Sequence, residues 1–576
     1  MRAAGGNPLF VHEMVAMAAE SGSEVTVPPT LQALLAARLD QLKRPERSVL
    51  ERGAVEGEVF HRGSVQALAG DEQVTPRLAA LVRKQLIRPD RTQLPGDDGF
   101  RFRHLLIRDA AYEALPKAVR AELHARFARW LEENGQSLVE LDEILAYHLD
   151  QACRYRDELG LEPDPELVGA ARARLRETGL RASSHLHDYE AAARAFARAL
   201  ELAGDEVDTV AGIQLAETLL WAGRGEEALE QARRFAAHAA GDRAALLCAR
   251  LTEAMLLTFF EPEGATERLE ALVAEAEPEF TAAGDEFGLY VAAKCRGQVA
   301  NMRGRLDELV AAYDDVAERA QRFGLPIVTA GWSSTGRIMG TASVQETLAW
   351  FERLDEVQRR NPFVRGSYAQ ALAMAGRADE ARAVLNALRD ELLERGSTAM
   401  LAVRDASHSM PVAELTGDLE EAAAFGESGC RGLEERGELT ILSTFAGYLA
   451  RVLYRLDRLD EGLAWAERGL ELGASDDALT QMVCRQAKAL VAARRGQADD
   501  AVRLAREAVD IALDTDFLNR QGDAFFDLGE VLALSGDQAG AADAYARALD
   551  CYERKGNVVS ADRTRGAARQ LRVATS

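Results

Sequence analysis

The sequence predicts an all-α fold in which a small N-terminal domain precedes a long array of stacked helical hairpins. Hydrophobic residues make up 47% of the 576 residues, but aromatic residues make up only 6%. The apolar surface therefore comes mostly from Ala and Leu, which suit closely packed helices better than sheets. A short turn signal also recurs about every 40 residues through the second half of the chain. These observations exclude an all-β fold and indicate a repeat protein.

The turn signal is a glycine, then acidic residues, then an alanine five residues after the glycine. Counted from Gly376, successive signals lie 41, 40, 39 and 40 residues apart, and Asp457 stands in the glycine position of one of them. We expect the glycine to end one helix in a left-handed conformation and the acidic residues to begin the next helix. The alanine then lets the two helices approach closely. The clearest glycines are Gly223, Gly376, Gly417, Gly496 and Gly536, and their alanines are Ala228, Ala381, Ala422, Ala501 and Ala541.

Gly264 and Gly304 extend this register, so about nine or ten hairpins are expected over residues 185–560. A single hairpin cannot bury its apolar face, and stacking buries it. The last unit resembles a tetratricopeptide repeat (TPR), because its large, small and aromatic residues fall on that family's positions. The resemblance implies a right-handed αα superhelix of TPR-like repeats with a concave binding surface. The residues that carry it are Phe525, Leu528, Gly529, Leu532, Gly536, Ala541, Tyr545, Ala548 and Leu549.

Before the array, the hydrophobic pattern changes to short amphipathic segments. GFRFRHLLIRDAAYEAL, from Gly99, is typical of a strand that runs into a helix. Three helices followed by a small hairpin describe a winged helix, with the turn of its wing at 93–99, where Pro95 and Gly96 supply the bend. The three helices are expected within residues 27–42, 47–55 and 75–88.

Three separated motifs resemble the C-terminal part of the STAND class of signalling ATPases, especially LuxR-type and nucleotide-cyclase-linked bacterial regulators. They are GGNPLFVHEM, VPPTLQALLAARLDQL and RFRHLLIRDAAYEAL, in the family's order. The resemblance implies that Gly6, Asn7 and Pro8 form a turn whose proline lies against the adenine ring. It also implies that His104 contacts the β-phosphate of bound ADP, although Leu105 replaces the family's aspartate. The alternative is that His104 only satisfies a backbone carbonyl at a strand end.

No GxxxxGK[ST] phosphate loop occurs in the chain, and an NTPase of this class needs one. We therefore expect the ATPase core to precede this chain, and ATP or ADP to bind only in a full-length parent. The chain alone is expected to have no cofactor, no catalytic residue and no enzyme activity. The expected parts are 1–29 as the end of the ATPase core, 30–115 as the winged-helix domain, 116–184 as a helical connector, 185–560 as the repeat array and 561–576 as a C-terminal tail.

Other motifs predict structure rather than chemistry. GWSSTGRIMGT, from Gly331, has phosphate-loop glycines without the GK[ST] ending, so a close helix contact is the better interpretation. His185 and His187 point about 200° apart on a helix and make a poor metal site. The six cysteines form no CxxC pair, so no zinc or redox site is expected.

Charge and hydropathy limit the partners. The formal net charge of −24 argues against binding to nucleic acid or to an anionic membrane. No apolar run reaches the roughly 20 residues that span a bilayer, and the N-terminus lacks a secretory signal. We therefore expect a cytoplasmic protein.

The leading hypothesis is a regulatory module for signal transduction, with transcriptional regulation as one output. In it the array binds a protein or small-molecule inducer, and the winged helix passes that event to the ATPase core. Two alternatives stay open: the regulatory part of an ATP-binding nucleotide cyclase or kinase, and a free-standing TPR adaptor. Self-association of the array is also open.

Overall fold

The computed structural model describes residues 31–70, 73–92, 94–323 and 330–575. They form two compact units. The first comprises the described residues up to 178 together with 198–204, and the second comprises 179–197 and the described residues from 205 onward. No helix in these described ranges is both long and apolar enough to cross a membrane.

The first unit begins with a cluster of short helices around a three-stranded antiparallel sheet of strand order β1-β3-β2. Phe60 pairs with Phe100, and Ile87 pairs with Phe102. Phe60, Ile87 and Phe102 are buried against the helices. The elements are α2 (Leu31–Asp40), α3 (Arg44–Glu56), β1 (Val59–His61), α4 (Arg62–Ala69), α5 (Thr75–Arg83), β2 (Ile87–Asp90), β3 (Gly99–Phe102) and α6 (Leu105–Glu113).

The sheet corrects one expectation for this region and adds elements that were not predicted. The helix expected over 75–88 ends at Arg83, Gln85 takes a left-handed φ of 57°, and strand β2 follows. Ile87 pairs with Phe102 of β3 and is fully buried, so tertiary packing overrides the helical pattern here. Strand β1 and helix α4 lie in a segment for which no element was predicted.

Three long helices complete the first unit: α7 (Lys117–Asn134), α8 (Leu141–Glu158) and α9 (Pro165–Arg181), the last of which runs into the second unit. They lie in the region where connecting helices were predicted. Pro165 is the first residue of α9, where its missing N–H costs no hydrogen bond.

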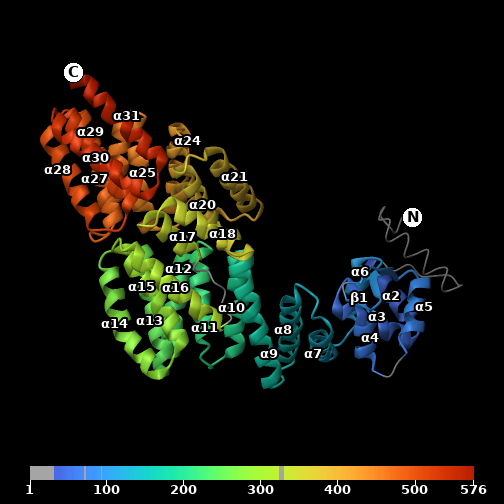
Figure 1. The fold of residues 1–576 in the computed structure, drawn as a ribbon. Coiled ribbons are helices and arrows are strands. Elements are labelled where there is room, and N and C mark those ends of the chain that lie inside the picture. The colour runs from blue at the N-terminus through green and yellow to red at the C-terminus, as the bar shows by residue number, and fades with distance from the viewer. Residues whose placement is uncertain (1–30, 71–72, 93, 324–329, 576) are drawn as a thin grey trace. The chain divides into compact units, whose positions relative to one another are not determined.

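The second unit is an array of antiparallel helical hairpins, drawn in green to red in Figure 1. Its helices are η2 (Ala182–Leu186), α10 (Tyr189–Ala203, whose end from residue 198 belongs to the first unit), α11 (Thr209–Trp221), α12 (Gly225–His238), η3 (Ala239–Gly241), α13 (Arg243–Phe260), α14 (Ala265–Ala283), α15 (Glu286–Met302), α16 (Leu306–Phe323), α17 (Ala330–Met339), α18 (Val344–Arg353), α19 (Glu356–Arg360), α20 (Pro362–Met374), α21 (Ala378–Glu394), α22 (Thr398–Arg404), η4 (Asp405–Ser409), α23 (Met410–Leu415), α24 (Leu419–Glu434), α25 (Leu439–Arg455), α26 (Leu459–Leu472), α27 (Ala478–Arg494), α28 (Ala498–Leu513), α29 (Leu518–Leu534), α30 (Gln538–Lys555) and α31 (Val558–Thr575). The segment expected as a tail thus lies largely within α31.

The hairpin turns have the predicted geometry. The five glycines of the turn signal have φ between 74° and 88°, and Asp457, in the same phase, has a φ of 61°. The five alanines that follow them are fully buried, with 0% of their surface exposed. In the last unit, an added Cβ on Gly529 would lie 2.7 Å from the ring of Tyr545, so only glycine allows this approach. The prediction of an all-α array of TPR-like hairpins is confirmed.

The array also turns back on itself, which its sequence period did not indicate. Ser475 Oγ donates to Glu263 Oε1 at 2.8 Å across 212 residues of sequence. Lys555 Nζ donates to the carbonyl oxygen of Gly340 at 2.8 Å across 215 residues. These bonds join hairpins that lie one superhelical turn apart, so much of the inner surface is enclosed between two turns.

Candidate functional site

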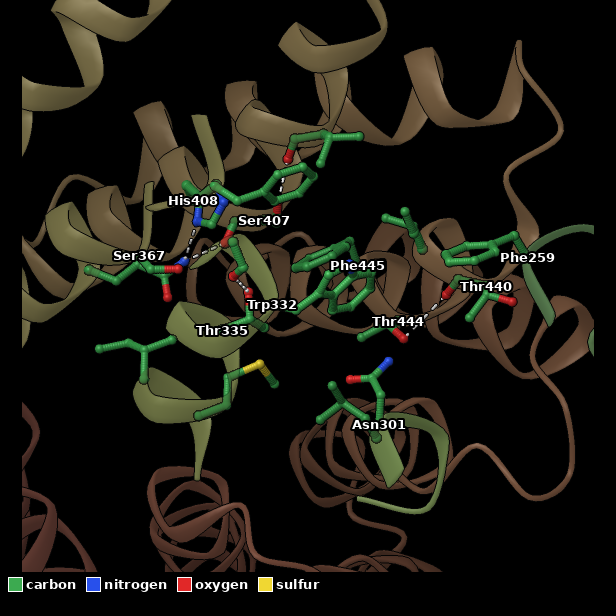
Figure 2. Close-up of a pocket in the computed structure, with 18 of the residues that line it drawn as sticks. Phe259, Asn301, Trp332, Thr335, Ser367, Ser407, His408, Thr440, Thr444 and Phe445 are labelled. Carbon is green, nitrogen blue, oxygen red and sulfur yellow. Dashed lines mark hydrogen bonds between the residues drawn. The ribbon is translucent and has the colours of Figure 1, made fainter. Parts of the chain in front are cut away.

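The candidate site is a cavity of about 180 Å³ inside the array. Helices from both superhelical turns supply its wall, which combines aromatic rings with amides and hydroxyls. Figure 2 shows Trp332, His408 and Phe445 around this space. The lining residues are Tyr189, Trp221, Phe259, Gln298, Asn301, Gly331, Trp332, Thr335, Ile338, Met339, Asn361, Phe363, Ser367, Gln370, Val403, Ser407, His408, Thr440, Ile441, Thr444, Phe445, Tyr448, Leu479 and Arg520.

Small residues bring helix α17 to the cavity. A Cβ on Gly336 would lie 2.8 Å from Leu309 Cδ2, and one on Gly331 would lie 3.2 Å from Phe363 Cβ. The helix therefore packs closely on its neighbours, and Trp332 and Thr335 line the cavity beside Gly331. This confirms that GWSSTGRIMGT makes a helix contact, and it adds a role in the cavity wall.

Aromatic rings form a connected part of the wall. The ring of Trp332 stacks on Tyr313 with centroids 5.9 Å apart. Trp221 lies 6.4 Å from Trp332 and meets Phe363 edge-on at 5.6 Å. Such rings offer large apolar surfaces with little rotational freedom to lose on binding.

A π-helical turn, η4, places Ser407 and His408 in the wall. Pro411 has no backbone N–H, so the carbonyl of Ser407, four residues earlier, cannot receive the usual helical hydrogen bond. The side chain of Gln370 donates to that carbonyl instead. Local breaks of this kind often accompany functional sites, because they turn side chains out of the helical register.

His408 is a neutral hydrogen-bond donor in this wall. Burial, with a contribution from the nearby guanidinium of Arg404, lowers the pKa of His408 to about 3. The Gln370 side chain, 3.1 Å away, donates to Nδ1, so the single ring proton sits on Nε2. His408 is only 6% exposed, and Nε2 has no acceptor among the described protein atoms.

Tyr448 presents a second unused polar group. Its hydroxyl is buried, has no partner among the described protein atoms, and belongs to a residue only 4% exposed. Burial raises the pKa of Tyr448 to about 12, so the hydroxyl keeps its proton at neutral pH. The guanidinium of Arg520 lies 4.3 Å from the ring centroid, and Arg520 also bonds Asp523 at 2.8 Å.

A buried group of ion pairs, which we term the arginine cluster, lies around Arg520. Arg451 bonds Asp527 at 2.9 Å, and Arg455 bonds Glu414 at 3.1 Å. Although burial opposes it, the guanidinium groups of Arg451 and Arg520 lower the pKa of Asp523 to about 2. The members of the cluster are Arg451, Arg455, Arg520, Arg563, Glu414, Asp523 and Asp527. Four guanidinium groups thus face three carboxylates.

A smaller cavity of about 70 Å³ shares Trp332 with the first. It holds an ion pair between Lys294 and Glu217, and Lys294 Nζ lies 4.8 Å from the centroid of Tyr290. Burial lowers the pKa of Lys294, but the carboxylate of Glu217 more than offsets this, so the pKa is raised above its usual value. The two charges therefore compensate each other inside the array.

The residues expected to bind nucleotide do not line this cavity. Gly6, Asn7 and Pro8 lie outside the described residues. His104 lies in the first unit as the exposed N-cap of α6, and its Nδ1 accepts a hydrogen bond of 3.2 Å from the backbone N–H of Leu106. Its nucleotide contact stays a prediction.

The described residues hold no group of three or more His, Cys, Asp and Glu side chains placed to bind a metal ion. His187 takes a left-handed φ of 51° at the end of the π-helical turn η2.

Sequence reasoning missed His408, Tyr448 and Arg520, because each stands alone in an ordinary helical pattern. One local signal was available. Pro411 interrupts a helical pattern, and a proline there leaves a carbonyl that another group must satisfy.

Among known proteins, only solved structures resemble this chain, and the likeness is one of fold. No protein-family profile matches the chain, and no curated protein matches it. Among solved structures, a STAND protein with a tetratricopeptide repeat sensor from Pyrococcus horikoshii is 14% identical, with a TM-score of 0.38, over 96% of this chain and 68% of its own. A Rap protein complexed with Competence and Sporulation Factor is 13% identical, with a TM-score of 0.47. The match covers 60% of this chain and 98% of the Rap protein. The Cut9–Hcn1 hetero-tetramer of the APC/C is 11% identical, with a TM-score of 0.43. The match covers 81% of this chain and 91% of that chain. Likenesses this distant say nothing about what this chain binds.

Proposed function

We propose that this chain is the regulatory arm of a STAND-type signalling ATPase, whose repeat array binds an inducer in the inner cavity. The observation that carries this proposal is a cavity whose wall comes from both superhelical turns. A ligand there contacts both turns, so it binds one arrangement of the turns more tightly than another and shifts their equilibrium. That differential affinity is the physical basis of a sensor.

The fold of the first unit supports the proposed role of a winged helix beside the nucleotide. Helices followed by the β2–β3 hairpin, with β1 completing the sheet, fit a winged helix whose wing is the loop between Asp90 and Gly99. His104 follows β3 directly and is exposed, as a contact to ADP requires. In the parent protein, Gly6, Asn7, Pro8 and His104 would bind ADP, and the winged helix would pass the inducer signal to the ATPase core in the cytoplasm.

A neutral fluorescent dye tests the cavity. We expect N-phenyl-1-naphthylamine to bind the chain with one site per molecule, because the wall is rich in aromatic rings. Thr335→Trp, which fills the cavity, should abolish the fluorescence gain while circular dichroism stays unchanged.

Thr281→Trp is the matched control. Thr335 and Thr281 each bond the carbonyl four residues earlier in their helix, but Thr281 is exposed on α14. Equal dye binding by the wild type and Thr335→Trp would contradict the proposal.

A further inference from the structure

We infer that the inner cavity takes an uncharged aromatic ligand with a carboxamide-type group, and that Asn301 recognises that group. This inference rests on the proposed function, because it names the class of ligand that the sensor cavity binds. Three features of the wall lead to it: charges that are already paired, a free side-chain amide and joined aromatic rings.

The charged side chains at the two cavities are already paired. Arg520 lines the larger cavity and bonds Asp523 at 2.8 Å. Lys294 lines the smaller cavity and is paired with Glu217. The low pKa of His408 keeps its ring neutral at pH 7. A charged group on a ligand would therefore lose its water without gaining an opposite charge, so the cavity selects against ions.

The positive charge left over in the arginine cluster does not alter this selection. Arg563, the fourth guanidinium of the cluster, lines neither cavity, and 31% of its side chain is exposed. By contrast, only 2% of the Arg451 side chain is exposed. Solvent therefore screens the charge of Arg563, and the wall itself carries no unpaired charge.

Two polar groups of the wall are enclosed by protein. A Cβ on Gly366 would lie 2.6 Å from Nε2 of His408, so this nitrogen packs against α20. Neither Nε2 nor the hydroxyl of Tyr448 is accessible. These groups therefore cannot bind a ligand in the cavity as it stands.

Asn301 offers a polar group that is free to bind. Its side chain points into the cavity (Figure 2), is partly exposed, and is bonded to no protein group that the structure describes. Its backbone carbonyl accepts a hydrogen bond of 3.1 Å from the N–H of Gly304, which fixes the residue at the end of α15. The hydroxyl protons elsewhere in the wall are donated to backbone carbonyls, as at Thr335, Ser407 and Thr440.

The amide of Asn301 matches another amide. It holds an N–H donor and an oxygen acceptor in one plane, so its complement must present an acceptor and a donor side by side. A carboxamide, a lactam or a urea has such an edge. A carboxylate only accepts and an ammonium group only donates, so each leaves one atom of Asn301 without a partner.

The aromatic part of the wall specifies the remainder of the ligand. Trp221, Trp332 and Phe363 form a joined aromatic surface. A flat ring stacks favourably on such a surface. An uncharged aromatic carboxamide therefore uses all three features of the wall.

Four probes with the same ring test the inference by displacement of N-phenyl-1-naphthylamine. We expect naphthalene-2-carboxamide to bind at least tenfold more tightly than 2-naphthoate and 2-naphthylmethylamine, because the wall has no unpaired charge. It should also bind about tenfold more tightly than 2-methylnaphthalene, which cannot bond Asn301. Equal or tighter binding of either charged probe would overturn the inference.

An asparagine variant isolates the amide. Asn301→Leu removes a side-chain amide that has no protein partner, so the chain should stay folded and still bind the dye. The ratio of the affinities for naphthalene-2-carboxamide and 2-methylnaphthalene should fall from about ten to about one. Asn386→Leu is the matched control, since Asn386 is exposed on α21, and it should leave the ratio unchanged.

An unchanged ratio in Asn301→Leu would refute the inference while leaving the proposed function intact. Absence of dye binding by the wild type would instead refute the proposed function.

Discussion

The side-chain nitrogen of Lys555 donates a hydrogen bond of 2.8 Å to the carbonyl oxygen of Gly340, which lies 215 residues earlier in the chain. The same nitrogen donates to the carbonyl oxygens of Arg337 at 3.0 Å and Ala342 at 2.7 Å. Lys555 is fully buried at the end of α30. It thus satisfies carbonyls at and just after the C-terminal end of α17, the helix that carries Trp332 and Thr335 in the cavity wall.

Replacement of Lys555 should weaken the contact between the two superhelical turns. Lys555→Met keeps the apolar stem but leaves three buried carbonyl oxygens without this donor, so we expect a loss of roughly 2 to 4 kcal/mol in the free energy of unfolding. Hydrogen exchange should quicken in α17 and α30 first. Arg554→Met is the control, since Arg554 makes only an exposed ion pair with Asp550, worth less than about 1 kcal/mol. Equal exchange rates in the two variants would show that Lys555 does not join the turns.

Asp457 stands in a left-handed conformation that glycine adopts without strain. Asp457→Gly should raise the free energy of unfolding by up to about 1 kcal/mol, because the backbone strain is worth more than the exposed ion pair with Arg494. At Gly496 an added Cβ would meet no atom within 4 Å. Gly496→Ala should therefore lower the free energy of unfolding by about 1 kcal/mol, because alanine is strained in the left-handed conformation of this residue. Thermal unfolding followed by circular dichroism measures both, and a less stable Asp457→Gly would count against the shared turn geometry.

Two buried histidines should make the first unit sensitive to acid. Nδ1 of His124 and Nδ1 of His148 lie 2.8 Å apart. Burial, with Arg108 and Arg120 nearby, lowers the pKa of His124 to about 3, and burial also lowers the pKa of His148. The unfolded chain therefore takes up protons below about pH 6.5 that the folded chain refuses, so stability falls as the pH drops toward 3.

Each histidine contributes up to about 1.4 kcal/mol per pH unit in that window. His148→Gln should reduce the slope of the unfolding free energy against pH by about that amount between pH 4.5 and 6, as measured by urea unfolding. Substitution of the exposed His238 by Gln should not change it. An unchanged slope in His148→Gln would mean that the pair is protonated in the folded state.

His104 variants distinguish helix capping from nucleotide binding. His104→Ala removes the cap of α6 and should cost about 1 kcal/mol in the free energy of unfolding, whereas His104→Asp restores a cap. In the parent protein with its ATPase core, both variants should bind ADP about tenfold to a hundredfold more weakly, since a hydrogen bond to a charged group is worth about 1.5 to 3 kcal/mol. Calorimetry with ADP decides the matter. Wild-type affinity in both variants would leave His104 with the capping role alone.

The parts of the fold that depend on neighbouring residues could be predicted. The glycine of each turn signal and the alanine five residues later interact within one hairpin, so their spacing reports the hairpin directly, and even Asp457 was placed in phase. Strand β1, helix α4 and the early end of α5 at Arg83 could not be predicted. Strand β1 pairs with β3 about 40 residues further along, and the segment after α5 pairs with the same strand, so both conformations depend on tertiary contacts.

The sequence by itself determined that this protein is a stack of helical hairpins, because a 40-residue period records contacts that each repeat makes with itself and with the next. Only the tertiary structure decided which helices meet across a superhelical turn, as Lys555 and Gly340 do. That pairing depends on the small rotation between successive repeats, which accumulates over several hairpins and leaves no local pattern. The cavity that brings His408, Tyr448 and Arg520 into one wall arises from this accumulated rotation, so its residues became visible only in three dimensions.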